Sequence, residues 1–118
     1  MSRPFDQALR NARRDQRYPV SFAADMLVGR RRLSVTVRDL SSKGAMLSGA
    51  ELPPDGTRVL ITLGAATLSG VVAWQHEVYC GLALLEPIEP LQIVRDMTRV
   101  QARRAAKHTR HALHPPGR

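Results

Sequence analysis

Apolar and polar residues alternate along the middle of the chain, as they do in strands that bury one face. The alternation is regular over residues 33–38, and a preceding apolar stretch at residues 22–28 ends at Gly29. Further runs rich in β-branched and aliphatic residues follow, bounded by turn-forming residues. They lie at residues 59–63, 68–74 and 81–85. The chain is therefore expected to be mostly β.

Turn signals separate these runs at intervals of about ten residues. Pro53-Pro54-Asp55-Gly56 predicts a loop, and Gly64-Ala65-Ala66 predicts a hairpin turn between two strands. The last two runs are close enough along the chain to pair with each other across residues 75–79. Short strands at this spacing indicate a small antiparallel sandwich or barrel.

The hydrophobic period changes after Pro90, where residues 91–107 follow the spacing of an α-helix. One stripe of this helix is basic, because Arg95, Arg99 and Arg103 recur at every fourth position. Such a stripe is most often a solvated face, and contact with acidic protein, nucleic acid or membrane is the alternative. A different side of the helix carries Leu91, Val94, Met97 (or Thr98), Gln101 and Ala102, and the helix is expected either to cover the strands or to pair with a second copy of the chain.

Length and composition narrow the class of protein. The 118 residues fit one domain, and a hydrophobic content of 43% is enough for a core. No apolar run reaches the roughly 20 residues of a membrane span, and the first residues lack an apolar signal core. Cys80 is the only cysteine, which excludes a disulfide framework and a cysteine-based zinc site. We expect a cytoplasmic protein without membrane insertion.

The net charge of +8 indicates an anionic partner. Basic residues gather toward the two ends of the chain, and Arg58 is the only one between residues 45 and 90. Arg30, Arg31 and Arg32 are expected to decorate an exposed hairpin. The position of each basic cluster is therefore more informative than the total charge.

Arginines form the first candidate site. Arg13, Arg14 and Arg17 precede Pro19, which biases Tyr18 away from helix, so we expect them on a loop leading into the first strand. Mobile guanidinium groups suit phosphates and the O6/N7 edge of guanine. A solvated basic linker is the alternative interpretation.

The second candidate site directly follows the alternating strand. Asp39 and Ser41 are two residues apart and face the same side of an extended chain, and Gly44 permits a tight turn or a close backbone approach by a ligand. A carboxylate suits the N–H donors of guanine, and a hydroxyl with backbone N–H groups suits a phosphate or base oxygen. Capping of a turn is the simpler alternative for Asp39 and Ser41. No nucleophile–base pair accompanies these groups, so we do not expect an enzyme.

Taken together, Arg-x-x-x-Arg (Arg13, Arg17) and Asp-x-Ser-x-x-Gly (Asp39, Ser41, Gly44) resemble the PilZ domain, the bacterial receptor module for cyclic di-GMP. The resemblance covers roughly residues 13–86 and includes the later strands with their Trp and Gly. Arg10 and Arg14 have the same spacing as Arg13 and Arg17. We prefer Arg13 and Arg17 because the second arginine of the family lies just before the strand that contains the proline.

The resemblance implies a small six-stranded antiparallel β-barrel with a C-terminal α-helix, and a ligand on its outer face. The arginine loop is implied to wrap the ligand from one side, opposite the second motif. We expect a flexible basic segment at residues 1–12, the barrel and helix at residues 13–107, and a disordered tail at residues 108–118. Trp74 is expected in the core or at the barrel rim, on the same face as Val72 and Gly70.

The predicted function is a cyclic di-GMP receptor that changes conformation at its N-terminal arginine loop and relays the signal to an unidentified effector protein. No metal or further cofactor is expected, and the chain is expected to be a monomer or a homodimer. A nucleic-acid-binding barrel is the first alternative, disfavoured because the strands are expected to lack exposed aromatic residues for base stacking. A PilZ-like adaptor that binds no nucleotide is the second. The ligand-binding residues are predicted to be Arg13, Arg14, Arg17, Asp39, Ser41 and Gly44.

Overall fold

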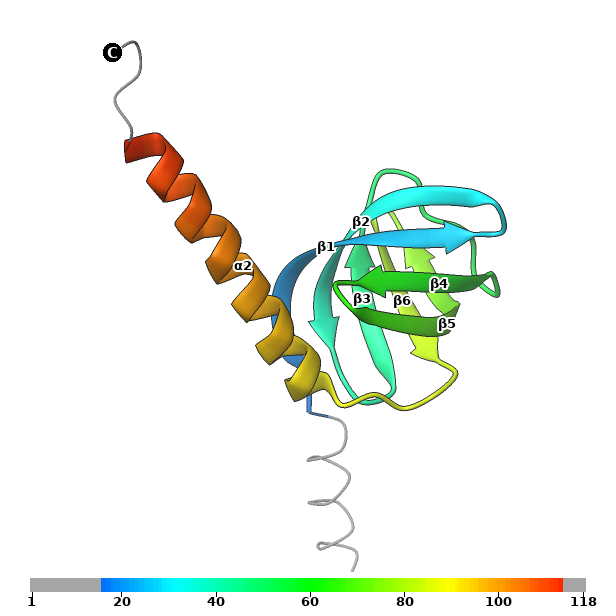
Figure 1. The fold of residues 1–118 in the computed structure, drawn as a ribbon. Helices are drawn as coiled ribbons and strands as arrows, with labels where there is room; N and C mark the ends of the chain where they lie inside the picture. Colours follow the sequence, from blue (N-terminus) through cyan, green and yellow to red (C-terminus); the bar gives the residue numbers. More distant parts are fainter. Residues whose placement is uncertain (1–15, 114–118) are drawn as a thin grey trace, which may run out of the picture.

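The computed structural model describes residues 16–113, including the side chains of residues 16–104. Its strands close into an antiparallel barrel in the order β1-β2-β3-β6-β5-β4, and a single helix follows the last strand (Figure 1). The prediction of a mostly β protein, with a six-stranded barrel and a C-terminal helix, is confirmed. The elements are β1 (Tyr18–Val28), β2 (Arg31–Leu40), β3 (Gly44–Ser48), β4 (Arg58–Leu63), β5 (Ala66–His76), β6 (Tyr79–Leu84) and α2 (Pro90–Leu113).

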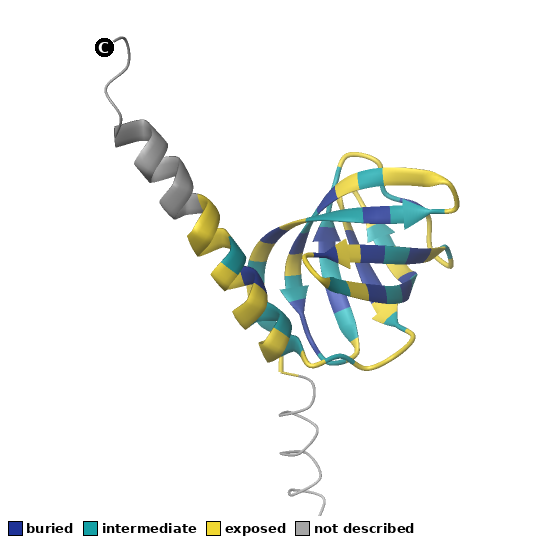
Figure 2. Cartoon of the chain, in the orientation of Figure 1, coloured by how far each residue is buried: buried dark blue, intermediate teal, exposed yellow. Residues whose placement is uncertain are grey.

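The barrel encloses an aliphatic core, as the alternating pattern predicts. In β2, Val35 and Val37 are buried while Ser34 and Arg38 are exposed, and β3, β4 and the first part of β5 alternate in a similar way (Figure 2). Each fully buried aliphatic side chain stabilises the fold by about 1.5–3 kcal/mol through removal from water. The largest side chains with almost no exposure are Met26, Val37, Leu40, Leu47, Ile61, Leu63, Val72 and Cys80.

Several strand ends differ from the prediction. β1 begins at Tyr18 rather than at residue 22, so Arg17 is the residue immediately before the barrel. β6 begins at Tyr79 and ends at Leu84, which leaves Leu85 outside the strand and exposed. The predicted turns agree better, since β4 and β5 join at Gly64-Ala65 and residues 53–56 form a loop.

Register shifts interrupt three of the strand pairs. They lie between Pro19 and Phe22 in β1, between Val37 and Asp39 in β2, and between Val72 and Trp74 in β5. Such bulges add a residue to one strand and change the side to which the following side chains point. Asp39 and Trp74 both follow a bulge, so strict alternation along the sequence assigns their faces wrongly.

The helix α2 is longer than predicted. It continues to Leu113 instead of ending at Lys107, so the predicted tail over residues 108–118 overlaps the end of the helix. The reason is that no proline or glycine interrupts the chain until Pro115, and alanine, arginine and lysine favour helix. No helix in the described part of the chain is long and apolar enough to cross a membrane. The predicted segment 1–12 and residues 114–118 lie outside the described residues.

The face of α2 that packs on the barrel differs in part from the predicted one. Val94 and Met97 contact the core as expected, but Leu91 is exposed and Ile93 takes its place. Gln101 is exposed, and its Nε2 donates a hydrogen bond to the carbonyl oxygen of Ser21, at 3.1 Å. The first half of the helix is thereby fixed against β1, while the predicted basic stripe is exposed at each of its three positions.

Candidate functional site

A groove on the outer surface of the barrel brings residues of both predicted motifs together. It has a volume of about 500 Å³, within the range of pockets that hold small ligands. From the motifs, Arg17, Ser41 and Gly44 line it. The other lining residues come from the turn before β3 and from β3, β5 and β6: Lys43, Ala45, Met46, Ala73, Trp74, Gly81, Leu82 and Ala83.

One row of register partners crosses four strands beneath this groove. Asp39 in β2 pairs with Met46 in β3, Met46 pairs with Gly81 in β6, and Gly81 pairs with Trp74 in β5. The row links the carboxylate of the second motif to the tryptophan on the other side of the groove. Both ends of the row follow a bulge, which explains why these two side chains lie on the outer surface.

Trp74 lies on the outer face of the barrel, not in its core. Trp74 is 43% exposed, whereas Val72, on the other side of the bulge, is buried. A Cβ atom built on Gly81 would collide with Nε1 and the adjoining ring carbons of the Trp74 indole. The ring therefore occupies the space above a glycine, with part of its surface open to solvent. The prediction of a core position for Trp74 is wrong, because it assumed unbroken alternation from Gly70.

The turn of the second motif is held by backbone hydrogen bonds. The Ser41 N–H and the Ser41 hydroxyl both donate to the Gly44 carbonyl oxygen, at 2.9 and 3.3 Å. The carbonyl oxygens of Ser42 and Lys43 accept from the N–H groups of Ile88 and Leu84, at 2.8 and 2.9 Å. The turn is thus tied to the end of β6 and to the segment that leads into α2.

Gly44 is needed for close packing at this turn. A Cβ atom on it would lie 3.1 Å from the carbonyl oxygen of Leu82 and 3.5 Å from the hydroxyl of Ser41. The first distance is shorter than almost all Cβ contacts in proteins, so a larger residue would push β3 away from β6. The close contact at Gly44 in the structure is with β6, and the close backbone approach by a ligand stays a prediction.

Arg17 and Asp39 connect the two motifs. Their Nη1 and Oδ1 atoms are 3.7 Å apart, and the guanidinium side chain is far more exposed than the carboxylate. Oδ1 of Asp39 is buried and accepts no hydrogen bond from the described residues. A buried carboxylate oxygen without a donor is costly unless a donor reaches it. The site therefore offers one acceptor that the described residues do not satisfy.

The structure places four of the six predicted site residues together and says nothing of the other two. Arg17, Asp39, Ser41 and Gly44 lie at or beside the groove. Arg13 and Arg14 lie outside the described residues. Lys43, Met46 and Trp74 line the groove but were not among the predicted residues. Met46 was detectable, because it alternates with the buried Ala45 and Leu47, whereas the exposure of Trp74 depends on a bulge.

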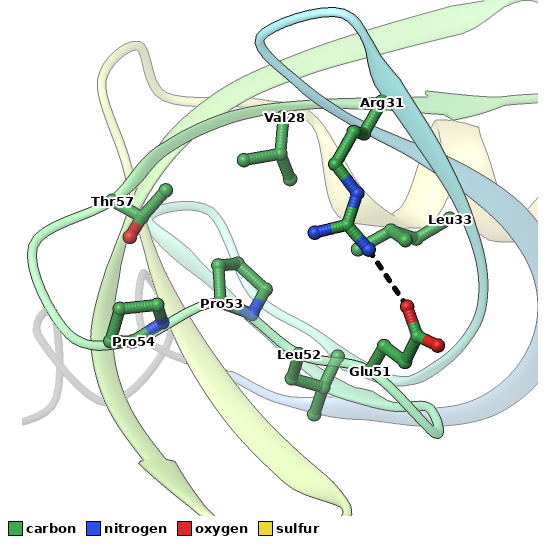
Figure 3. Close-up of a pocket in the computed structure, with 8 residues that line it drawn as sticks. All are labelled: Val28, Arg31, Leu33, Glu51, Leu52, Pro53, Pro54 and Thr57. Atoms are coloured by element: carbon green, nitrogen blue, oxygen red, sulfur yellow. Dashed lines mark hydrogen bonds and ion pairs between the residues drawn. The ribbon is translucent and has the colours of Figure 1, made fainter.

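A second hollow lies at the other end of β2, where that strand begins (Figure 3). Its volume is about 350 Å³, and its walls are largely the apolar side chains of Val28, Leu33, Leu52, Pro53 and Pro54. Arg31 extends along it and forms an ion pair with Glu51 at 2.8 Å, so this guanidinium is already matched by a carboxylate. Neither motif contributes a residue to this hollow. The groove beside Trp74 is therefore the stronger candidate for an anionic ligand.

Comparison with known protein families agrees with the geometry. Residues 11–99 match the family model of the PilZ domain. The match covers most of the chain, including both motifs, the whole barrel and the first part of α2. No curated protein matches the chain.

Proposed function

Because the chain belongs to the PilZ domain family, we propose that it is a receptor for cyclic di-GMP and that the groove beside Trp74 is the binding site. The observation that carries the proposal is the meeting of both motifs in one groove. Arg17 comes from before β1, Ser41 follows β2 and Gly44 begins β3, yet all three line the same surface. Arg13 and Arg14 belong to the proposed site through the family resemblance alone.

The charges and hydrogen-bonding groups of the groove suit a guanine nucleotide. Arg17 and Lys43 offer cations for the phosphates, and the arginine fork also fits the O6/N7 edge of guanine. The unsatisfied Oδ1 of Asp39 suits the N–H donors on the opposite edge of guanine. We propose that the ligand draws Arg17 partly away from Asp39. An N–H group of the guanine base then donates a hydrogen bond to Oδ1 of Asp39.

Trp74 supplies the aromatic surface that base stacking requires. Its indole is partly open to the groove and rests above Gly81. Stacking of a base on an aromatic side chain contributes about 1–3 kcal/mol. We propose that one guanine stacks on this ring while the phosphates meet the arginines.

The groove suits binding rather than catalysis. Ser41 is the hydroxyl-bearing residue among those lining it, and its Oγ donates to a backbone carbonyl instead of to a general base. A nucleophilic serine requires a base within hydrogen-bond reach. We therefore propose a receptor and adaptor without catalytic activity of its own.

The relay to a partner protein is proposed to begin at the two segments that touch the ligand. Ordering of the arginine segment around the ligand changes the surface next to β1. The turn at Ser42 and Lys43 passes any displacement to Ile88, because the Ile88 N–H is bonded to the Ser42 carbonyl oxygen, and α2 begins two residues later. The effector is expected to contact this side of the barrel, and its identity follows from capture with and without cyclic di-GMP.

Isothermal calorimetry with cyclic di-GMP tests the proposal. Wild type is expected to bind, and Arg17→Ala is expected to weaken binding by about 1.5–3 kcal/mol, or roughly 10- to 150-fold, as for other hydrogen bonds to charged groups. Arg32→Ala is the matched control, because it removes the same charge from an exposed residue at the start of β2, at the opposite end of that strand from the groove. This variant is expected to bind cyclic di-GMP as tightly as wild type does. Equal loss in both variants, or no heat with wild type, would reject the proposal.

A further inference from the structure

The basic stripe of α2, defined as Arg95, Arg99 and Arg103, is not used by the proposed nucleotide site. All three residues are exposed, and the described residues provide no ion pair for any of them. The one acidic residue of the helix, Asp96, accepts a hydrogen bond from Gln92 at 3.1 Å instead. The guanidinium groups of the basic stripe are therefore available to an external anion.

The second half of α2 stands clear of the barrel (Figure 1). Four consecutive residues, Gln101 to Arg104, are all exposed, and the contact that this turn makes with β1 is the hydrogen bond from Gln101 to Ser21. A helix that is polar all round needs favourable side-chain pairs or a partner to be stable. A protruding rod of this kind can enter a groove from which the barrel itself would be excluded.

Within the helix the arginines repel one another. Like charges four residues apart destabilise a helix by about 0.2–0.5 kcal/mol per pair, and the basic stripe contains two such pairs. Lys107 and Arg110 add further positive charge toward the C-terminal end of the helix, where the helix dipole partly offsets the cost. An anionic partner along this side would remove the repulsion and stabilise the helix.

We propose that α2 binds a nucleic-acid duplex, with the basic stripe directed at the phosphates along the major groove. An α-helix with its side chains is about 10–12 Å across, which fits the width of about 12 Å of the major groove of DNA. A duplex presents a negative charge about every 1.7 Å along its axis, on both walls of that groove. This dense, regular charge fits the exposed basic stripe, which lies on the part of the helix surface that does not pack on the barrel.

Two other anionic surfaces fit the helix less well. A helix lying in a membrane surface needs an apolar face with large side chains, but Ile93, Val94 and Met97 are packed on the barrel core. Beyond Val100 the helix carries only alanines and Leu113 as apolar residues. An acidic protein surface would match the charge, yet it offers no groove of uniform charge along the length of the stripe.

From the sequence alone, nucleic acid is disfavoured as a partner. That expectation concerns the strands of the barrel and does not apply to the helix. The reason for it, that the strands lack exposed aromatic residues, is wrong, since Trp74 and Tyr79 are exposed on the outer surface. The proposal for α2 goes beyond the proposed cyclic di-GMP site and does not depend on it. If a variant loses cyclic di-GMP binding, duplex binding can still be measured, and the reverse also holds.

Fluorescence anisotropy with a short, mixed-sequence, labelled DNA duplex tests the proposal on the full chain without cyclic di-GMP. The variant replaces the basic stripe with glutamine (Arg95→Gln, Arg99→Gln, Arg103→Gln), which keeps a high helix propensity. The matched control replaces Arg30, Arg31 and Arg32 with glutamine, so the net charge is the same. Circular dichroism at 222 nm checks that both variants keep the helix.

Wild type is expected to bind the duplex with an affinity that falls steeply between 50 and 200 mM salt. The stripe variant is expected to reduce the slope of log K against log salt by about 2.7, the value for three lost phosphate contacts. The control is expected to keep the wild-type slope. Equal effects in both variants would mean that bulk charge alone is responsible and would overturn the proposal.

Anionic vesicles and polyglutamate serve as competing probes in the same assay. The proposal predicts that each displaces the labelled duplex less effectively than unlabelled duplex does at equal charge. If vesicles or polyglutamate bind more tightly than duplex, and the stripe variant abolishes that binding, the partner of α2 is a membrane or an acidic protein and the proposal is wrong. Absence of duplex binding by wild type at 50 mM salt would also overturn it.

Discussion

The indole ring of Trp74 occupies the space in which a side chain on Gly81 would lie. The two residues are register partners on β5 and β6, and the bulge after Val72 turns Trp74 outward. A glycine and a tryptophan that are separate in the sequence thereby form the floor of the groove between β3, β5 and β6. The position of the ring depends on the absence of a Cβ atom across the sheet.

Substitution of Gly81 by alanine is expected to displace the indole and weaken ligand binding. The added Cβ would collide with the ring, which must move because the backbone is fixed by β3 on one side and β5 on the other. Loss of stacking predicts a decrease in affinity of about 1–3 kcal/mol. Fluorescence of Trp74, the only tryptophan, reports the displacement directly through a shift in emission.

The matched control for that variant is Ala83→Gly, at another position that lines the groove from β6. It changes the backbone of the same strand but places no atom against the ring. Its tryptophan emission is expected to match wild type. If Gly81→Ala also leaves emission and affinity unchanged, the ring does not rest where the structure places it.

Asp39→Ala is expected to weaken cyclic di-GMP binding without weakening the fold. The buried Oδ1 accepts no hydrogen bond from the described residues, and its ion pair with the largely exposed Arg17 spans 3.7 Å. A long ion pair with one largely exposed partner contributes no more than about 0–1 kcal/mol to stability, and removal of a poorly satisfied buried acceptor offsets that loss. Chemical denaturation of the ligand-free protein and calorimetry with ligand measure the two effects separately.

A fall in unfolding free energy of several kcal/mol for Asp39→Ala would show that the carboxylate is a structural group and not a ligand-binding one. Ser34→Ala, an exposed position on the same strand, serves as the control for a mild change in β2. It is expected to change neither stability nor affinity.

Gly64→Ala is expected to loosen the contact between the barrel and α2. Gly64 has a φ of 61°, and a Cβ on it would lie 2.7 Å from the sulfur of Met97, a buried residue of the helix. The positive φ alone costs about 1–2 kcal/mol for an L-residue, and overpacking adds about 1–3 kcal/mol. Urea denaturation measures the sum.

Gly29 separates these two costs, because its φ is also 61° but no atom lies within 4 Å of a Cβ built there. Gly29→Ala is expected to show the backbone cost alone, and Gly64→Ala is expected to lose at least about 1 kcal/mol more. Equal losses would mean that Met97 does not pack against this turn.

Cys80 is expected to resist alkylation in the folded protein. It is fully buried, and burial raises the pKa of its thiol from 9.0 to about 11. Because the unfolded chain releases this proton first, the contribution of the thiol to stability is complete below pH 9 and declines as the pH rises toward 11. Iodoacetamide labelling at pH 8 with and without urea tests the first point, and melting temperatures across this range test the second. Fast labelling of the folded protein would contradict the burial.

Much of the barrel follows from side-chain alternation, because each strand buries one face. Val35 and Val37 predict β2, and Val59 and Ile61 predict β4, through spacing alone. Gly64-Ala65 marks the turn between β4 and β5 because glycine accepts a positive φ. These features are local, so the sequence contains all the information they need.

The outward position of Trp74 is not local. It arises because Val72 pairs with Leu82 and Trp74 pairs with the next residue back, Gly81, which inserts one extra residue in β5. Alternation from Gly70 and Val72 places Trp74 on the wrong face, and only the pairing with β6 corrects it. The helix face is similar, since Ile93 packs against the barrel core while Leu91 is exposed, although both are apolar.

The candidate site was predictable in its residue types but not in its full extent. The spacing of Arg17, Asp39, Ser41 and Gly44 points to one ligand, and the structure brings these four positions together. The contribution of Lys43 and Met46 to the groove depends on how β3 lies between β2 and β6. That arrangement is a property of the closed barrel and not of any one motif.

The most direct measurement is a titration of Trp74 fluorescence with cyclic di-GMP, because this single tryptophan lines the proposed site. The account predicts saturable quenching of the indole, with a midpoint equal to the Kd from calorimetry, and loss of that response in Arg17→Ala. Constant tryptophan emission in a large excess of ligand would contradict the account. This holds both if calorimetry detects binding elsewhere on the protein and if it detects no binding.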